Sequence, residues 1–467
     1  MTELKQIGLY LFEMNTISQY SLGEWRLPGD KRTTYTSLGF WRELSEILEE
    51  GRFDGLFLAD IVGIHDVFRG SFDSAATEGT QFPNNDPFTL AASVLALTEH
   101  LSVGITASTS YSHPFELARR FSTLDHLSDG RIGWNIVLSH TENSSTNFGL
   151  DHQLEHDRRY DKAEEFLEVV FKLWEGSWDD NAVIADRERG IYADPRGIRY
   201  IDHHGEFFNV RGPHLSQPSV QRTPVLYQAT ASQRGYDFVA KNVEYVFTSG
   251  PNPAKVAENI KYTKQRAIEF GRAPEDVKSI VIVDVIVGRD DDEVARKISE
   301  IQRVASLAGK LTKGDSPIDY LAFSDETSLE EVLRLSGFDT QSYRDGSALP
   351  PLLPGLTLDH TIADAKKRIR ASHFSTFFAA GTPEVVADTI EEWADVYGVD
   401  AINLRPHHAF DSVRDFVELV VPELQRRGRL RTEYDKSTLR ERAFGPGNAR
   451  LNDRHPGARY RQSVVSR

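Results

Sequence analysis

Short apolar segments alternate along the chain with longer amphipathic segments. Runs rich in Ile, Val, Phe and Leu are followed by stretches with the apolar spacing of a helix. The segments that predict strands are 7–12, 53–60, 101–109, 131–137, 224–229, 245–250, 279–287 and 401–406. The clearest predicted helices span 156–176, 253–271 and 382–398, and each stops at a glycine. Eight strands with intervening helices predict an α/β fold, a (β/α)8 TIM barrel.

Three stretches interrupt this alternation: about 61–90, 178–223 and 305–375, all rich in Asp, Gly, Pro, Ser and Thr. Active sites of this fold lie at the C-terminal ends of the strands, so we expect all three to be insertions at that mouth. We expect one barrel over residues 1–430 and a C-terminal extension over 431–467, either solvated or docked.

The composition of the chain argues against several classes of partner and of active site. The net charge of −16 disfavours nucleic acids and anionic membrane surfaces as partners. The chain has no cysteine, which excludes disulfides, thiolate metal sites and cysteine nucleophiles. The histidines lack a complete set of metal ligands at zinc-like spacing, and no GxGxxG follows a strand to bind a nicotinamide nucleotide. Without a secretory signal or a long apolar run, a cytoplasmic location with no membrane segment is expected.

Several motifs carry a specific resemblance. They are RIGWNIVLSH (131–140), NFG (147–149), LEHDRRYDKAEEFLEVVFKLWEGSW (154–178), HHGEFFNVRGP (203–213) and SQRG (232–235). With them the chain resembles the nitrilotriacetate monooxygenase branch of the bacterial luciferase superfamily. Within that branch FEMN (12–15), FLADIVGIHDVFRGS (57–71) and the tail 444–461 look closest to the long-chain alkane and dimethyl sulfide monooxygenases.

The resemblance implies a TIM barrel that uses reduced FMN and O2. A separate NAD(P)H-dependent flavin reductase would supply the reduced FMN. A flavin hydroperoxide would then pass one oxygen atom to a small organic substrate of the long-chain alkane or organosulfur type. A homodimer or homotetramer is expected by the same analogy, and no metal is expected.

A phosphate site is predicted where Thr230, Ala231 and Ser232 lead from the fifth predicted strand into a helix, because a helix start favours an anion. His156 and Tyr160 are four residues apart on a helix and share one face. The resemblance implies that these positions hold the FMN phosphate. From the residues alone, a surface pair and an ordinary N-cap remain alternatives.

Three polar residues fall at or near the ends of predicted strands: Asp60, Ser108 and Asn135. The resemblance implies that they contact the flavin ring. Taken singly, each has a structural alternative as a capping carboxylate, a strand-end hydroxyl or a buried amide.

On the substrate side the candidate catalytic residues are His140, His65 and Gln81. His140 follows the fourth predicted strand, and an imidazole there is suited to acid–base chemistry near neutral pH. Phe12 and Trp134 are candidates for an apolar pocket wall, with core packing as the stronger explanation.

The chain departs from its alkane- and sulfide-oxidising relatives at Thr16, Gln19 and His65, where they carry Cys, His and Tyr. These positions are expected on the substrate side. Thr230 replaces a usual glycine, so the backbone approach to the flavin is expected to differ. More polar residues favour a polar heteroaromatic substrate, and riboflavin lyase, which splits riboflavin into lumichrome and a sugar, is an alternative. A deazaflavin-dependent oxidoreductase and a flavin-binding protein without chemistry are further alternatives.

Overall fold

The fold is a closed parallel barrel. The computed structural model describes residues 5–20, 22–139, 141–344 and 348–461. Over these residues the strands of the main sheet are β1 (Gly8–Met14), β2 (Gly55–Ala59), β3 (Ser102–Ser108), β4 (Ile132–Val137), β9 (Val225–Ala229), β10 (Tyr245–Phe247), β11 (Lys278–Val287), β12 (Phe377–Gly381) and β13 (Ala401–Leu404). Leaving out β12, neighbouring strands pair in parallel around a complete ring, since β10 pairs β11 and β13 pairs β1. The predicted barrel and its eight strands are confirmed.

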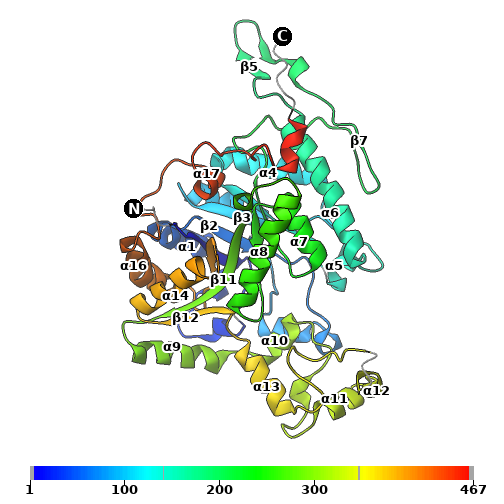
Figure 1. The fold of residues 1–467 in the computed structure, drawn as a ribbon, viewed down its shortest axis with the longest axis vertical. Helices are drawn as coiled ribbons and strands as arrows, with labels where there is room; N and C mark the ends of the chain where they lie inside the picture. The colour runs from blue at the N-terminus through cyan, green and yellow to red at the C-terminus, as the bar shows by residue number, and fades with distance from the viewer. Residues whose placement is uncertain (1–4, 21, 140, 345–347, 462–467) are drawn as a thin grey trace.

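Helices surround the ring (Figure 1). They are α1 (Leu38–Glu50), α3 (Pro87–Leu97), α4 (Pro114–Ser128), α5 (Glu142–Asn147), α6 (His156–Phe171), α7 (Gln233–Asn242), α8 (Pro253–Glu269), α9 (Asp291–Val304), α14 (Pro383–Asp395), α15 (Asp411–Asp415) and α16 (Val421–Arg426). The helices predicted over 156–176, 253–271 and 382–398 are confirmed as α6 with a following π-helical turn η4 (Lys172–Gly176), α8 and α14. No described helix is long and apolar enough to cross a membrane.

Side chains of each strand alternate between two cores. On β1, Leu9 and Leu11 face the helices, whereas Tyr10 and Phe12 point into the barrel. Trp134 belongs to the outer set: it is fully buried, and its indole N–H donates to the carbonyl of Ala107 (3.1 Å). Packing therefore accounts for Trp134, which does not line the cavity described below.

The strand β12 was missing from the sequence prediction. It pairs only with the second half of β11, residue 283 opposite 377 through 287 opposite 381. β12 is five residues long, consists of FFAAG and leads within two residues into α14, so neither length nor alternation distinguishes it from a helix start.

The C-terminal segment is docked on the N-terminal end of the barrel. Leu439 of α17 (Leu439–Phe444) joins the inward-facing cluster that contains Tyr10 and Tyr245. The next residue, Arg440, is buried and pairs with Glu244 (2.7 Å). A short 3-10 helix, η9 (Pro456–Tyr460), completes this docked segment. The N-terminal end is therefore closed, and a ligand must enter from the opposite end.

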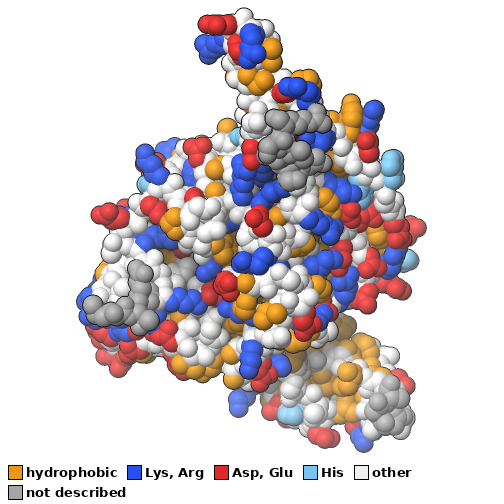
Figure 2. All heavy atoms as spheres, turned by 45° about the horizontal axis from the view of Figure 1, so that its top comes forward, with side chains coloured by type: hydrophobic (Ala, Val, Ile, Leu, Met, Phe, Trp, Pro, Cys, Tyr) orange, Lys and Arg blue, Asp and Glu red, His pale blue; other side chains and the backbone are white. Residues whose placement is uncertain are grey.

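Residues 61–90 and most of 305–375 form a helical lobe at the C-terminal end of the strands. Its elements are η3 (Phe68–Gly70), α2 (Asp73–Glu78), α10 (Leu307–Lys313), η7 (Tyr320–Ala322), α11 (Leu329–Leu335), α12 (Thr340–Arg344) and α13 (Ile362–Ala371). Phe68 packs with Leu311, Tyr320 and Ile362 in a hydrophobic cluster separate from the barrel cores. The lobe stands out from the barrel at the lower end of Figure 1 and the lower right of Figure 2.

Residues 178–223 do not lie at the mouth of the barrel, where we expected them. They follow α6 and lead into β9, so they begin and end at the N-terminal side of the strands. They form two hairpins, β5 (Val183–Asp186) with β6 (Ile191–Ala193) and β7 (His203–His204) with β8 (Asn209–Val210), at the end of the molecule opposite the lobe (Figure 1).

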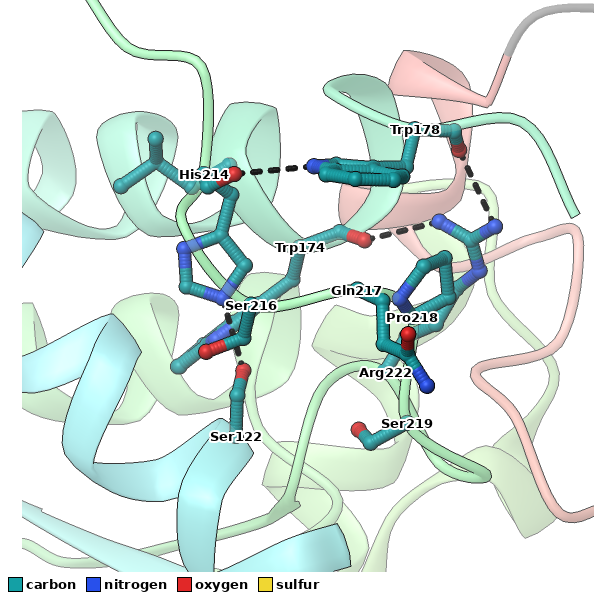
Figure 3. A pocket seen from close by; sticks show the side chains of 10 residues that line it. Ser122, Trp174, Trp178, His214, Ser216, Gln217, Pro218, Ser219 and Arg222 are labelled. Atoms are coloured by element: carbon teal, nitrogen blue, oxygen red, sulfur yellow. Dashed lines mark hydrogen bonds between the residues drawn. The ribbon is translucent and has the colours of Figure 1, made fainter. Parts of the chain in front are cut away.

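The base of these hairpins is held by hydrogen bonds (Figure 3). The guanidinium of Arg222 donates to the carbonyls of Trp174 and Trp178 (3.0 Å each), and the Ser122 hydroxyl lies 2.8 Å from His214 Nε2. The crevice between these side chains has no room for a ligand. We therefore assign it a structural role.

A buried polar cluster joins the start of the chain to the last strands. His373 Nε2 and His407 Nδ1 lie 2.7 and 3.2 Å from a carboxylate oxygen of Glu24. Burial alone would raise the pKa of Glu24, but hydrogen bonds and charges from the two imidazoles outweigh it and lower the pKa to about 2. Asp284 lies between His407 (3.0 Å) and Arg405 (2.6 Å). Glu24, His373 and His407 are close enough to hold one metal ion. The hydrogen bonds and ion pairs just described also explain why these three side chains lie together.

Candidate functional site

A cavity of about 430 Å³ opens at the C-terminal ends of the strands. This volume lies within the range of roughly 300–1,000 Å³ that is typical of small-molecule sites. Its lining residues are Phe12, Met14, Tyr20, Phe57, Ala59, Asp60, Ile61, His65, Gln81, Thr106, Asn135, Ile136, Val137, Leu138, Ser139, Thr141, Ser144, His156, Arg159, Tyr160, Gln228, Ala229, Phe247, Ile282 and Lys313. Of the predicted site residues, the cavity brings together Asp60, Asn135, His156, Tyr160, His65 and Gln81.

Asp60 follows directly after β2 and faces the cavity. Its Oδ1 accepts a hydrogen bond from Asn84 Nδ2 (2.7 Å), and Asn84 also donates to the carbonyl of Ile61 (3.0 Å). Burial raises the pKa of Asp60 to about 7, although the hydrogen bond from Asn84 opposes the rise. A carboxyl group with this pKa can be present in either protonation state near neutral pH.

Two buried amides face the cavity with an unused acceptor. Asn135 Nδ2 donates to Thr106 Oγ1 (2.8 Å), whereas Asn135 Oδ1 has no partner among the described residues. Gln228, near the end of β9, is 1% exposed, and its Oε1 is likewise without a described partner. A buried acceptor without a donor is costly, so both oxygens indicate a ligand that carries N–H or O–H groups. The sequence prediction missed Gln228, although its place at a strand end was a usable signal.

The first turns of α6 give the cavity a polar end. His156 and Tyr160 share one face of α6, as expected from their spacing; their rings lie edge to face with centroids 5.2 Å apart, and both line the cavity. Between them, Arg159 also lines it and donates to the carbonyl of Ser139. Arg159 Nε is buried and has no described partner. Arg159 was not predicted, although its position within the HDRRY motif put it on the turn that holds His156 and Tyr160.

The start of α7 lies against this polar end. Ser232 is its N-cap, and the Ser232 hydroxyl accepts from the backbone N–H of Gly235 (3.1 Å). A Cβ atom added at Gly235 would lie 1.7 Å from Thr230 Oγ1 and 2.5 Å from the Tyr160 hydroxyl. Thr230, Ala231 and Ser232 are therefore beside the cavity, whose lining includes the preceding Ala229. Thr230 Oγ1 is buried without a described partner.

Ser108 lies behind the cavity wall. It ends β3, and its Oγ accepts from Ser139 Oγ (2.9 Å), while Ser139 itself lines the cavity. The structure therefore gives Ser108 the position of a support for Ser139, which has φ of 48°. The expected contact of Ser108 with a flavin stays a prediction.

Two predicted catalytic residues are in contact with each other in the cavity wall. His65 Nε2 lies 3.1 Å from Gln81 Oε1, and His65 Nδ1 lies 2.9 Å from Asp315 Oδ1. Gln81 also donates to the sulfur of Met14 (3.4 Å). Asp315 belongs to the helical lobe, so the lobe fixes the orientation of an imidazole at the cavity wall. The third candidate, His140, lies outside the described residues.

Thr16 and Gln19, which were expected on the substrate side, do not line the cavity. The Thr16 hydroxyl donates to the carbonyl of Pro83 (2.6 Å), and Gln19 Nε2 donates to the carbonyl of Phe12 (3.2 Å). Both side chains are buried and engage backbone groups. They hold the segment after β1 in place.

Comparison with known proteins identifies the family. The family model described as luciferase-like monooxygenase matches residues 25–400. The chain belongs to this family. It is 42% identical to the long-chain alkane monooxygenase of Geobacillus thermodenitrificans, with 98% of each chain covered. It is 37% identical to the dimethyl-sulfide monooxygenase of Hyphomicrobium sulfonivorans, over 99% of this chain and 95% of the relative.

A crystal structure of riboflavin lyase with modified FMN and riboflavin is 34% identical, with a TM-score of 0.86, and covers 98% of this chain and 100% of its own. The predicted family and its enzyme class, flavin-dependent monooxygenase, are confirmed.

Proposed function

We propose that this chain is the oxygenase component of a two-component monooxygenase that binds reduced FMN and oxidises a small organic substrate with O2. The observation that carries the proposal is the polar pattern of the cavity. The amide oxygens of Asn135 and Gln228 face it without a partner in the described part of the chain, and Arg159 and Tyr160 also line it. FMN has polar ring N–H groups and a phosphate, so it matches both features.

Each of these residues then has a defined task. The Arg159 guanidinium and the Tyr160 hydroxyl donate to the phosphate, next to the start of α7. Asn135 Oδ1 and Gln228 Oε1 accept hydrogen bonds from the polar edge of the ring. Reduced FMN, when bound, supplies the electrons that activate O2. The aromatic wall of Phe12, Phe57 and Phe247 is packed tightly, and it excludes water from the reacting side.

The substrate side is the end of the cavity at His65 and Gln81. Asp315 Oδ1 lies against His65 Nδ1, so the imidazole presents Nε2 to Gln81 and the cavity in a fixed orientation. A separate NAD(P)H-dependent flavin reductase is the proposed partner, because this chain has no nucleotide-binding GxGxxG motif after a strand.

Riboflavin cleavage is a second candidate. It is favoured by the likeness to riboflavin lyase and by the polar side chains of His65 and Gln81 on the proposed substrate side. The alkane and sulfide relatives favour oxygen insertion instead. The substrate panel below separates the two.

The test is aerobic turnover with FMN, NADH and a generic flavin reductase, followed by mass spectrometry of long alkanes, dialkyl sulfides and riboflavin. An added oxygen atom supports oxygen insertion, and lumichrome supports the lyase. Arg159→Met should weaken FMN binding by about tenfold or more, because it removes a charged phosphate contact. The neighbouring Arg158→Met is the matched control, since Arg158 is exposed and pairs with Glu206. Equal FMN affinity in both variants would refute the phosphate assignment.

A homo-oligomer also remains a prediction. The projecting β5–β6 hairpin exposes apolar side chains, Tyr192 at 63% and Ile184 at 41%, which supports a contact with another copy. The cytoplasmic location is likewise still a prediction.

A further inference from the structure

The cavity wall contains a lysine, Lys313, that has no ion-pair partner in the described ranges. Lys313 is the last residue of α10, and it lines the cavity together with Tyr20. Its ammonium lies 3.8 Å from the centre of the Tyr20 ring. Among the residues that the structure describes, none forms an ion pair with Lys313. The nearby Asp315 is engaged by His65 instead.

The surroundings of Lys313 are connected by contacts around one end of the cavity. The Tyr20 ring lies edge to face with Phe12, at 5.3 Å between centroids. Asp315, two residues after Lys313, holds His65, which contacts Gln81. Lys313 is therefore linked through Asp315 to the part of the cavity wall that contains the two predicted catalytic residues.

The charge pattern of the cavity selects among substrates. Among its described lining residues the single carboxylate is Asp60, and burial raises the pKa of Asp60 to about 7. The whole chain has a net charge of −16, which repels anions at long range. The Lys313 ammonium, which has no ion-pair partner among the described residues, opposes that repulsion locally, and Arg159 is the other Lys or Arg side chain among the described lining residues. An ammonium group is suited to a compact anion, which it can bind as a point charge.

We propose that Lys313 is a specificity-determining residue that binds an anionic group, such as a carboxylate, sulfonate or phosphate, on the organic substrate. This proposal rests on the proposed function, because it assumes that FMN occupies the rest of the cavity. Lys313 holds the charged end of the substrate against Tyr20, and the apolar remainder extends along Phe12 toward the flavin. The lysine comes from the helical lobe, so the lobe takes part in substrate choice.

The role of Lys313 is tested by measuring how substrate-like probes bind to the FMN-loaded protein. The probes are dodecanoate, dodecanesulfonate, dodecyl phosphate and the neutral dodecanol, measured by isothermal titration calorimetry. We expect at least one anion to bind more tightly than dodecanol. Lys313→Met should weaken the binding of that anion about tenfold or more, and it should change the affinity for dodecanol by less than about twofold. Lys313→Arg should retain the preference for the anion over dodecanol. Added salt should weaken the binding of the anion and leave the binding of dodecanol unchanged.

The control variant is Lys367→Met, an exposed lysine on α13 of the same lobe, which should change neither class of probe. Equal binding of anions and dodecanol to the wild type, or an unchanged anion affinity in Lys313→Met, would overturn the proposal. So would a loss of FMN affinity in Lys313→Met, because the lysine would then serve the flavin. Failure of the proposed function is distinguishable: FMN itself would not bind the wild-type protein, or FMN would bind without any oxidised product.

Discussion

Gly235→Ala should destabilise the wild-type protein, but it should stabilise a variant in which the side chains of Thr230 and Tyr160 are shortened. In the wild-type protein the new Cβ meets Thr230 Oγ1 at 1.7 Å and the Tyr160 hydroxyl at 2.5 Å, so both side chains must move. Overpacking of this kind costs about 1–3 kcal/mol. Alanine in a helix is favoured over glycine by about 1 kcal/mol, which offsets part of the loss. We expect a net destabilisation of about 1 kcal/mol.

In a Thr230→Gly, Tyr160→Phe background both close contacts are gone, and only the helix preference remains. Gly235→Ala should then stabilise the protein by about 0.5–1 kcal/mol. The assay is urea unfolding of all four proteins, followed by far-ultraviolet circular dichroism and tryptophan fluorescence. The same destabilisation in both backgrounds would refute the reasoning, because it would mean that Thr230, Tyr160 and Gly235 do not meet at one point.

Two further variants test charges in the barrel. Burial raises the pKa of Asp60 to about 7 in the folded protein, so the folded state binds the proton more tightly and wild-type stability falls as pH rises toward that value. We therefore expect the melting temperature of Asp60→Asn minus that of the wild type, both without FMN, to increase from about pH 5 to about pH 8. A difference that does not change with pH would contradict the raised pKa of Asp60. Arg440→Met should cost about 3–5 kcal/mol in urea unfolding because it leaves buried Glu244 unpaired. Adding Glu244→Gln should recover part of this loss, and an additive double variant would rule out the pairing.

The barrel was predictable because its strands repeat a simple physical pattern. Residues 279–287 form an apolar run long enough to span a buried strand, and 253–271 has a helical stripe with a Pro at its start. β12 was not predictable in the same way, since five small and aromatic residues beside a helix fit either structure. The placement of 178–223 was missed because composition identifies an insertion but not the end of the barrel from which it leaves.

The candidate site was predictable where a single strand end or helix turn determines the geometry. Asp60 after β2, and His156 with Tyr160 on one helix face, needed no tertiary information. Lys313 and Asp315 come from a lobe about 250 residues after His65, and only the fold brings them to the cavity. Ser108 illustrates a different case, since its place at a strand end did not reveal that its hydroxyl accepts a hydrogen bond from Ser139, which lines the cavity.

The most direct test of the central claim is a crystal structure of the protein with FMN, grown or soaked under anaerobic conditions. We predict the flavin in the 430 Å³ cavity, with its phosphate against Arg159 and Tyr160 and its ring within hydrogen-bond distance of Asn135 Oδ1 and Gln228 Oε1. FMN bound elsewhere on the chain, or bound in this cavity with its phosphate toward Lys313, would contradict the account.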